Sequence, residues 1–98
     1  MTINKTTNGK EVIIGVSGRI DSKTAPEFES QVKECFAEAD SIVIDLADVN
    51  YISSAGLRVF LAAHKAMDAK KGMKVKNVCK EVMNIFVVTG FSGVLDIE

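Results

Sequence analysis

The feature that most constrains the fold of this chain is an alternation of short apolar runs with longer segments of helical periodicity. Residues 12–16 and 41–46 are rich in Val and Ile, which predicts buried strands in the interior of a sheet. Residues 73–78 alternate apolar and polar side chains, as a half-buried strand does. Strands that alternate with helices favour right-handed crossover connections and a mostly parallel sheet.

The two ends of the chain complete the predicted sheet. Residues 2–6 form a weak strand candidate, and residues 94–97 form a short final strand. The Asn8-Gly9 pair is a strong signal for a hairpin turn, so the first two strands are expected to be antiparallel. The predicted fold class is therefore α/β, with a mixed, mostly parallel sheet of about five strands, an N-terminal antiparallel hairpin and three helices packed on it.

The first predicted helix begins near Thr24. This residue and Glu27 have the spacing of a capping box, and Pro26 lies in the first turn, where its missing N–H does little harm. Apolar side chains at helical spacing then predict a buried face. That face consists of Phe28, Val32, Cys35, Phe36 and Ala39.

Two further helices follow. One is predicted over residues 55–71, with Gly72 as its C-terminal cap. The other is predicted over residues 81–89, with Gly90 at its end. The side chains of this last helix that are expected to face the core are Val82, Ile85 and Phe86.

The second helix is apolar nearly all the way round near its start. Packing on the sheet accounts for one stripe of side chains, but Leu57 and Leu61 are expected to face elsewhere. Two interpretations are open. The leucines pack beneath a neighbouring helix, or they form an exposed apolar patch that marks a partner surface.

The length and charge of the chain limit its function class. Ninety-eight residues predict a single domain over residues 1–98. Twelve Lys and Arg against 13 Asp and Glu give a net charge of -1, without the basic surplus of nucleic-acid binders. Residues 1–10 contain no apolar signal region, and no apolar run is long enough to cross a bilayer. We expect a cytoplasmic protein that binds neither nucleic acid nor membrane.

The sequence lacks the patterns of a catalytic site. Its only histidine, His64, follows Ser54 by ten residues on the same predicted helix, which separates the two by about 15 Å. Neither a Gly-x-Ser-x-Gly motif nor a Gly-rich phosphate-binding loop occurs. We therefore predict no catalytic residues, no cofactor and a protein that is not an enzyme.

Cysteines and carboxylates do not predict a metal site either. Cys35 and Cys79 are too few and too far apart for a disulfide framework or a zinc site, and are expected to be small buried thiols. Asp21, Asp45 and Asp48 fall near predicted strand ends, where an acidic pocket is conceivable. Turn and capping roles are favoured for each of them, and no metal is predicted.

Ser53 and Ser54 stand where a strand-rich segment gives way to the second helix. The start of a helix offers unpaired backbone N–H groups and a partial positive charge. A serine at this place either caps the helix or carries a phosphate in an environment that favours one. The function is therefore expected to depend on this junction.

Four segments of the chain carry a family resemblance. Residues 44–57 read Ile-Asp-Leu-Ala-Asp-Val-Asn-Tyr-Ile-Ser-Ser-Ala-Gly-Leu, and characteristic elements also occur at residues 18–25, 75–82 and 86–91. Together they closely resemble STAS domains, specifically the bacterial anti-sigma factor antagonists. The resemblance spans nearly the whole chain.

The resemblance implies a phosphorylation switch. In that family, an anti-sigma factor that is also a serine kinase inactivates a sigma factor, and the unphosphorylated antagonist releases the sigma factor by binding the kinase. Phosphorylation of one serine breaks the complex, and a serine phosphatase restores it. The resemblance implies Ser54 as the phosphorylated residue, with Ser53 as a second candidate. The implied partner-binding residues are Asp21, Ser53, Ser54, Gly56, Leu57, Arg58 and Leu61.

Two positions depart from the family pattern. Many antagonists carry Asp immediately before the phosphorylated serine, whereas this chain has Ser53, and Ala55 replaces a frequent serine or threonine. The missing aspartate favours an alternative. The chain is then a STAS scaffold, or a small subunit that binds the ATPase of a membrane transporter, and its serines only cap a helix.

Overall fold

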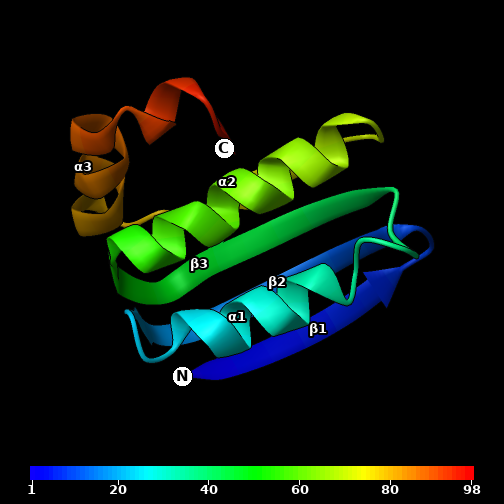
Figure 1. Ribbon diagram of the computed structural model, residues 1–98, viewed down its shortest axis with the longest axis horizontal. Helices are drawn as coiled ribbons and strands as arrows, with labels where there is room; N and C mark the ends of the chain where they lie inside the picture. Colours follow the sequence, from blue (N-terminus) through cyan, green and yellow to red (C-terminus); the bar gives the residue numbers. More distant parts are fainter.

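The computed structural model describes residues 1–98 and contains one five-stranded sheet, whose strand order β1-β2-β3-β4-β5 follows the chain (Figure 1). β1 and β2 are antiparallel, and every other neighbouring pair is parallel. The predicted fold class is therefore confirmed. The strands are β1 (Thr2–Asn8), β2 (Glu11–Ile20), β3 (Ser41–Ile52), β4 (Met73–Lys76) and β5 (Asp96–Ile97). The helices are α1 (Ala25–Lys33), α2 (Ser54–Asp68), α3 (Lys80–Thr89) and a short 3₁₀ turn, η1 (Phe91–Gly93).

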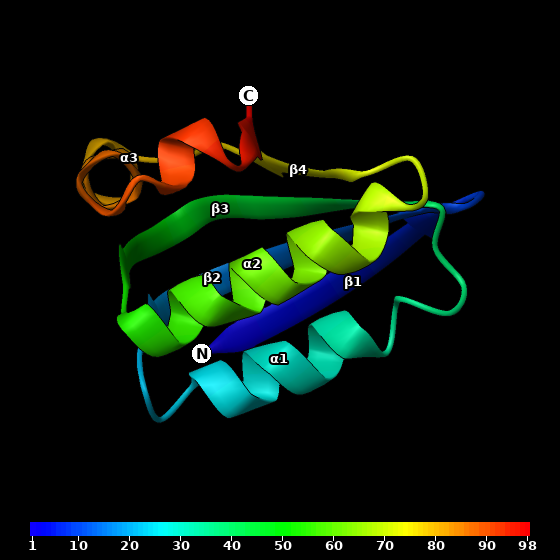
Figure 2. The same cartoon turned by 45° about the horizontal axis from the view of Figure 1, so that its top comes forward.

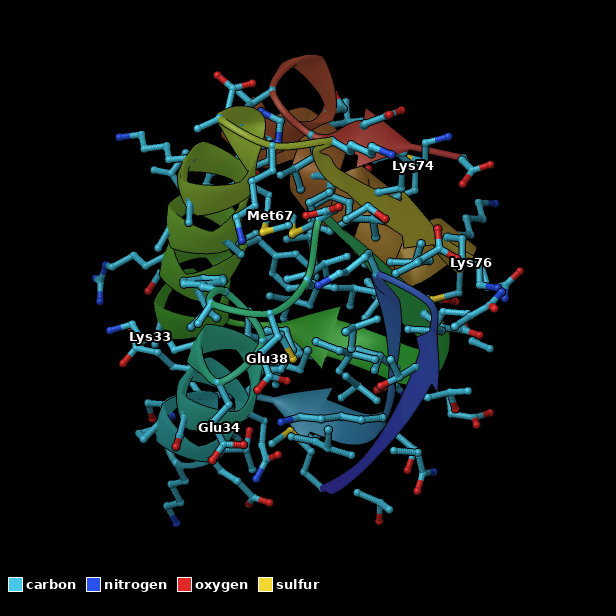
Figure 3. All side chains as sticks on the ribbon, turned by 90° about the vertical axis from the view of Figure 1, so that its right-hand side faces the viewer. Lys33, Glu34, Glu38, Met67, Lys74 and Lys76 are labelled. Atoms are coloured by element: carbon cyan, nitrogen blue, oxygen red, sulfur yellow. The ribbon has the colours of Figure 1, made fainter.

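The core lies between the sheet and its helices. α1 and α2 lie side by side over one face of the sheet (Figures 1 and 2). A row of three fully buried rings joins the helices, because Phe60 of α2 packs against Phe28 of α1 and Phe86 of α3, with ring centroids 5.3 and 5.8 Å apart. Figure 3 shows Met67 of α2 pointing inward, whereas Lys74 of β4 lies toward solvent.

α1 is shorter than its apolar pattern predicts. It ends at Lys33, although Cys35 and Ala39 are still buried beyond it. The N–H groups of Cys35 and Phe36 bond to carbonyls three residues earlier, which tightens the chain into 3₁₀ geometry. The ammonium of Lys70 donates to the carbonyl oxygens of Phe36 and Ala39, at 2.8 Å for the latter. A side chain distant in sequence thus satisfies carbonyls that a longer helix would have used.

The predicted end of the second helix is also wrong. α2 begins at Ser54 and ends at Asp68, so that Ala69 and not Gly72 is its C-terminal cap. Gly72 adopts a φ of 94°, and its N–H bonds to the carbonyl of Met67 at 3.1 Å. This glycine closes the turn that follows the helix, because the left-handed backbone needed there is open to glycine. α3 agrees with the prediction, since Gly90 is its left-handed cap.

Strand boundaries differ from the prediction at several places. β2 and β3 both extend past their predicted ends at residues 16 and 46. β4 ends earlier, because Asn77 adopts a φ of 57°, which strand pairing does not allow. β5 is cut to two residues by the 3₁₀ turn before it. The hairpin loop consists of Gly9 and Lys10, one residue later than predicted, because Asn8 still pairs with Glu11.

Candidate functional site

The two serines at the start of α2 have different environments. Ser53 has extended backbone geometry, its Oγ accepts the N–H of Gly56 at 3.3 Å, and its own N–H donates to the carbonyl of Ile20 at 2.7 Å. It is therefore the N-cap, and it ties the helix to the end of β2. Ser54 is the first helical residue and is exposed. The residue thus lies exposed at the positive end of a 15-residue helix.

Gly56 allows α2 to approach the sheet closely. A Cβ at this position would lie 2.6 Å from Cγ2 of Ile20 and 2.9 Å from Cγ2 of Ile52. Both isoleucines are buried at the ends of their strands. The glycine therefore sets the height of the helix start above the sheet, and with it the position of Ser54.

The structure decides between the two interpretations for Leu57. Leu57 is only 6% exposed and belongs to the core, so the exposed-patch interpretation is wrong for it. Leu61 is half-buried. Arg58, by contrast, is exposed on the side of α2 that faces α1. There it lines a groove of about 200 Å³, together with Ser22, Ala25, Pro26, Glu29, Ala55 and Val59.

The loop between β2 and α1 is held by Asp21 and Thr24. Oδ1 of Asp21 accepts the N–H groups of Lys23 and Thr24 at 2.9 and 3.0 Å. The Thr24 hydroxyl accepts the N–H of Asp21 at 2.9 Å and donates to the carbonyl of Arg19 at 2.7 Å. Thr24 occupies the N-cap position of α1, but its side chain makes no capping bond. The predicted capping box is therefore wrong, because these loop contacts engage the hydroxyl.

These bonds favour the charged form of the Asp21 carboxyl and engage only one of its two oxygens. The backbone N–H of Thr24 is the main cause that lowers the pKa of Asp21 below its ordinary value of 3.8. A lowered pKa means that the carboxylate stabilises the fold above pH 3.8 and loses this effect as the pH falls through the lower folded-state value. The backbone bonds all end on Oδ1, so Oδ2 is left for a partner.

We expect Thr24→Val to lower the free energy of unfolding by about 1–2 kcal/mol, because it removes two short hydrogen bonds that close the loop. Ser22→Ala, a change at an exposed position of the same loop, is the control and should have an effect within about 0.5 kcal/mol. Urea unfolding followed by circular dichroism measures both. Equal midpoints for the two variants would show that Thr24 does not hold the loop.

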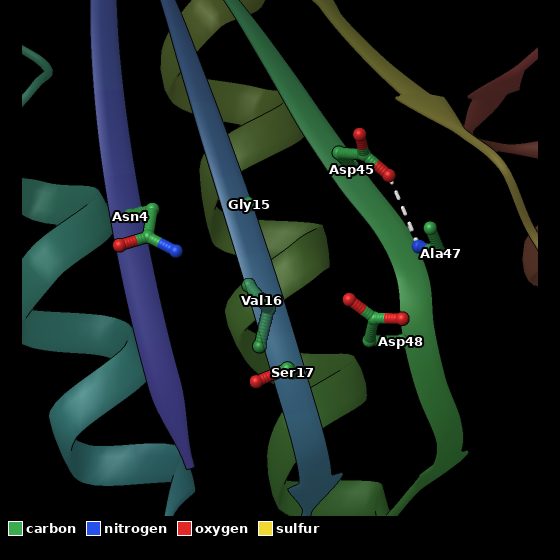
Figure 4. Close-up of a pocket in the computed structure, with 7 residues that line it drawn as sticks. All are labelled: Asn4, Gly15, Val16, Ser17, Asp45, Ala47 and Asp48. Atoms are coloured by element: carbon green, nitrogen blue, oxygen red, sulfur yellow. Dashed lines mark hydrogen bonds between the residues drawn. The ribbon is translucent and has the colours of Figure 1, made fainter.

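The three aspartates near the predicted strand ends do not all lie in one place. Asp45 and Asp48 line a pocket of about 130 Å³ on the sheet (Figure 4), and Asp21 is not part of it. Oδ1 of Asp45 accepts the N–H of Ala47 and the side-chain amide of Asn77, each at 3.0 Å. No three His, Cys, Asp or Glu side chains gather closely enough to hold a metal ion. Asp45 lies within β3, so the predicted turn role is wrong for it, and its side chain instead joins β3 to Asn77, the residue after β4.

The reactive side chains are dispersed. Cys35 is a free thiol whose pKa is raised by burial, and the Cys79 thiol donates to the carbonyl of Val49 at 3.3 Å. His64 lies half-buried further along α2 than Ser54, and its Nδ1 is enclosed without a hydrogen-bond partner.

No helix has both the length and the apolar character that a membrane crossing requires.

One pair near the serines has no signal in the sequence. The guanidinium of Arg19 lies 4.2 Å from the centre of the Tyr51 ring, within range of a cation–π interaction. A shift in the register of β2 and β3 between Gly18 and Ile20 brings the two residues together. Because the pair joins two strands across a bulge, only the folded chain reveals it.

Comparison with known proteins supports a single family. The pattern of the STAS domain family matches residues 2–98. An anti-sigma-B factor antagonist of Listeria monocytogenes is 33% identical over 88 residues, which cover 87% of this chain and 76% of the relative. One of Bacillus subtilis is 27% identical over 92 residues, which cover 93% of this chain and 84% of the relative.

A solved structure agrees with this assignment. The crystal structure of an anti-sigma factor antagonist from Mycobacterium paratuberculosis superposes with a TM-score of 0.89 at 25% identity. The match covers 98% of this chain and 83% of the other. Strand order, the helix start with its serines and the family pattern lead to the same conclusion: the chain belongs to the STAS domain family.

Proposed function

We propose that this protein is an anti-sigma factor antagonist of the bacterial cytoplasm whose binding is switched by phosphorylation of Ser54. Unphosphorylated, it binds an anti-sigma factor that is a serine kinase, and the sigma factor is released. The observation that carries the proposal is that the two serines occupy different positions at the start of α2. Ser53 caps α2, which leaves the Ser54 hydroxyl exposed for a kinase at the first position of the helix.

The surroundings of Ser54 suit a phosphate. The modification adds about -1.5 to -2 charges, which the free N–H groups and the dipole of the helix start favour. Arg58 lies one turn further on, and its exposed side chain offers a guanidinium for the phosphate. A kinase surface that fits the uncharged serine would have to remove water from the negatively charged phosphate in order to bind. The complex is thereby weakened by the charge itself, without a change in the fold.

We expect Ser54→Asp to abolish capture of a serine-kinase anti-sigma factor from host lysate, whereas the wild type and Ser54→Ala retain it. Ser30→Asp, which adds the same charge at an exposed position of α1, is the control and should capture the kinase normally. Mass spectrometry identifies the captured protein, and circular dichroism shows that each variant is folded. Capture of a transporter ATPase or another scaffold partner by all four proteins would instead support the alternative STAS function.

A second assay assigns the modified residue. The captured kinase, with ATP, should phosphorylate the wild type and not Ser54→Ala, and a serine phosphatase should reverse the reaction. Ser53→Ala should remain a substrate, although loss of its cap lowers the stability of the protein. The pure protein incubated with ATP alone should stay unmodified, in keeping with a binding protein that is not an enzyme.

A further inference from the structure

Arg19 and Tyr51 form a preorganised cationic site on the exposed end of the sheet. The Thr24 hydroxyl fixes the carbonyl of Arg19, and the Tyr51 ring holds the guanidinium at 4.2 Å. Arg19 is exposed and Tyr51 is half-buried. Holding an arginine in place before binding reduces the conformational entropy that the complex must lose, which is typical of residues that dominate an interface.

The guanidinium has no carboxylate partner within the chain. The two ion pairs of the structure join Lys5 to Glu34 and Lys33 to Glu29, and neither includes Arg19. Asp21 is near enough for the charge of Arg19 to lower its pKa slightly, but its Oδ1 is engaged by its own loop. The planar fork of N–H donors is therefore free for a carboxylate from outside, which it can bind through two parallel hydrogen bonds.

The pair lies within reach of any partner that covers the serines. Tyr51 precedes Ser54 by three residues, so their Cα atoms are at most about 11 Å apart. A standard interface buries about 800 Å² on each protein, the area of a disc of about 16 Å radius. A footprint centred on Ser54 is therefore wide enough to reach the Arg19–Tyr51 pair. Lys23 and Arg58 are exposed near the same end, so Arg19 is one of three arginine and lysine side chains that a partner can meet there.

We propose that the Arg19–Tyr51 pair is a second contact point of the kinase-binding surface and receives an Asp or Glu side chain of the kinase. This inference rests on the proposed function. It assigns the two contact points different roles. Phosphorylation of Ser54 controls whether the kinase binds. Arg19 contributes to which partner binds, because it favours one with a carboxylate at the matching position.

The test uses the kinase recovered by the wild-type protein, purified and titrated against variants of the full chain by calorimetry. Arg19→Ala should weaken binding by about tenfold or more, and Arg19→Lys should fall between, since it keeps the charge but loses the fork. Tyr51→Phe should bind nearly as the wild type does, whereas Tyr51→Leu should weaken binding through loss of the ring. Lys65→Ala, which removes an exposed charge late in α2, is the matched control and should leave affinity unchanged.

Two further observations separate this contact from a structural effect. Thermal unfolding of Arg19→Ala should match that of the wild type, since the side chain is exposed. The double variant Arg19→Ala with Tyr51→Leu should bind about as weakly as Arg19→Ala alone, because the ring acts through the arginine. Binding should also depend less on salt in Arg19→Ala than in the wild type.

The outcomes distinguish this inference from the proposed function. If Arg19→Ala binds as tightly as the wild type while Ser54→Asp does not bind, the inference is wrong and the switch stands. The inference is also wrong if Arg19→Ala alters only the ³¹P NMR titration of the phosphorylated protein, because the guanidinium then serves the protein's own phosphate. If the wild type recovers no kinase, the proposed function fails and the inference fails with it.

Discussion

Phe60→Ala should lower the free energy of unfolding by about 3–5 kcal/mol, the largest loss expected from a single change in this protein. Phe60 is fully buried and contacts the rings of Phe28 and Phe86, so it is the residue through which the three helices share one core. Its truncation removes apolar burial and two aromatic contacts and leaves a cavity that the flanking rings cannot fill. Since domains of this size are stable by about 5–15 kcal/mol, the variant should be near the limit of folding.

Phe60→Leu separates the contribution of volume from that of the aromatic contacts. It keeps most of the buried surface and should cost about 1–2 kcal/mol, less than the loss with alanine. Urea unfolding of both variants gives the comparison. A loss with alanine that is no larger than the loss with leucine would contradict the central position of this ring in the core.

Gly56→Ala should lower the free energy of unfolding by about 1–3 kcal/mol, although alanine is the better helix former by about 1 kcal/mol. The added methyl group would lie 2.6 Å from Cγ2 of Ile20 and 2.9 Å from Cγ2 of Ile52. Both neighbours are β-branched, packed and restricted to few rotamers, so relief requires α2 to lift from the sheet. At about 4–8 °C for each kcal/mol, the melting temperature should fall by about 5–20 °C.

Gly93→Ala is the matched control, because a Cβ there meets nothing within 4 Å and the backbone is not left-handed. Its melting temperature should be that of the wild type or slightly higher. The Gly56 variant should in addition bind the kinase less well than its residual stability predicts, because lifting the helix start displaces Ser54. Unaltered stability in Gly56→Ala would show that the helix start tolerates a wider spacing.

The sequence predicts the type and order of the elements well, because Val- and Ile-rich runs and helical periodicity are local signals. It does not predict the ends of helices and strands where these depend on residues distant in the sequence. Nothing near residue 33 indicates that Lys70 will satisfy the carbonyls that follow α1. Nothing in the run at residues 41–46 indicates that β3 continues beside β2 up to Ile52, since that pairing is made across the sheet.

In the candidate site, too, local features can be predicted from the sequence, whereas contacts between distant residues cannot. The junction of strand and helix can be located from sequence, but a cap at either serine is compatible with it, and backbone geometry selects Ser53. Gly56 is implied as a partner contact, yet the structure gives it a packing role between two isoleucine side chains. The Arg19–Tyr51 pair requires knowledge of a bulge between two strands and lies beyond any local pattern.

The sheet has one more consequence, which concerns how the protein folds as it is synthesised. Its strands are arranged in chain order, so each new strand adds beside the one before it and no late segment must insert into a completed sheet. β2, β3 and α2, which together hold the two serines, are complete by Asp68. The core around Phe60 is complete only when α3 has been added, because Phe86 supplies one of its two ring contacts.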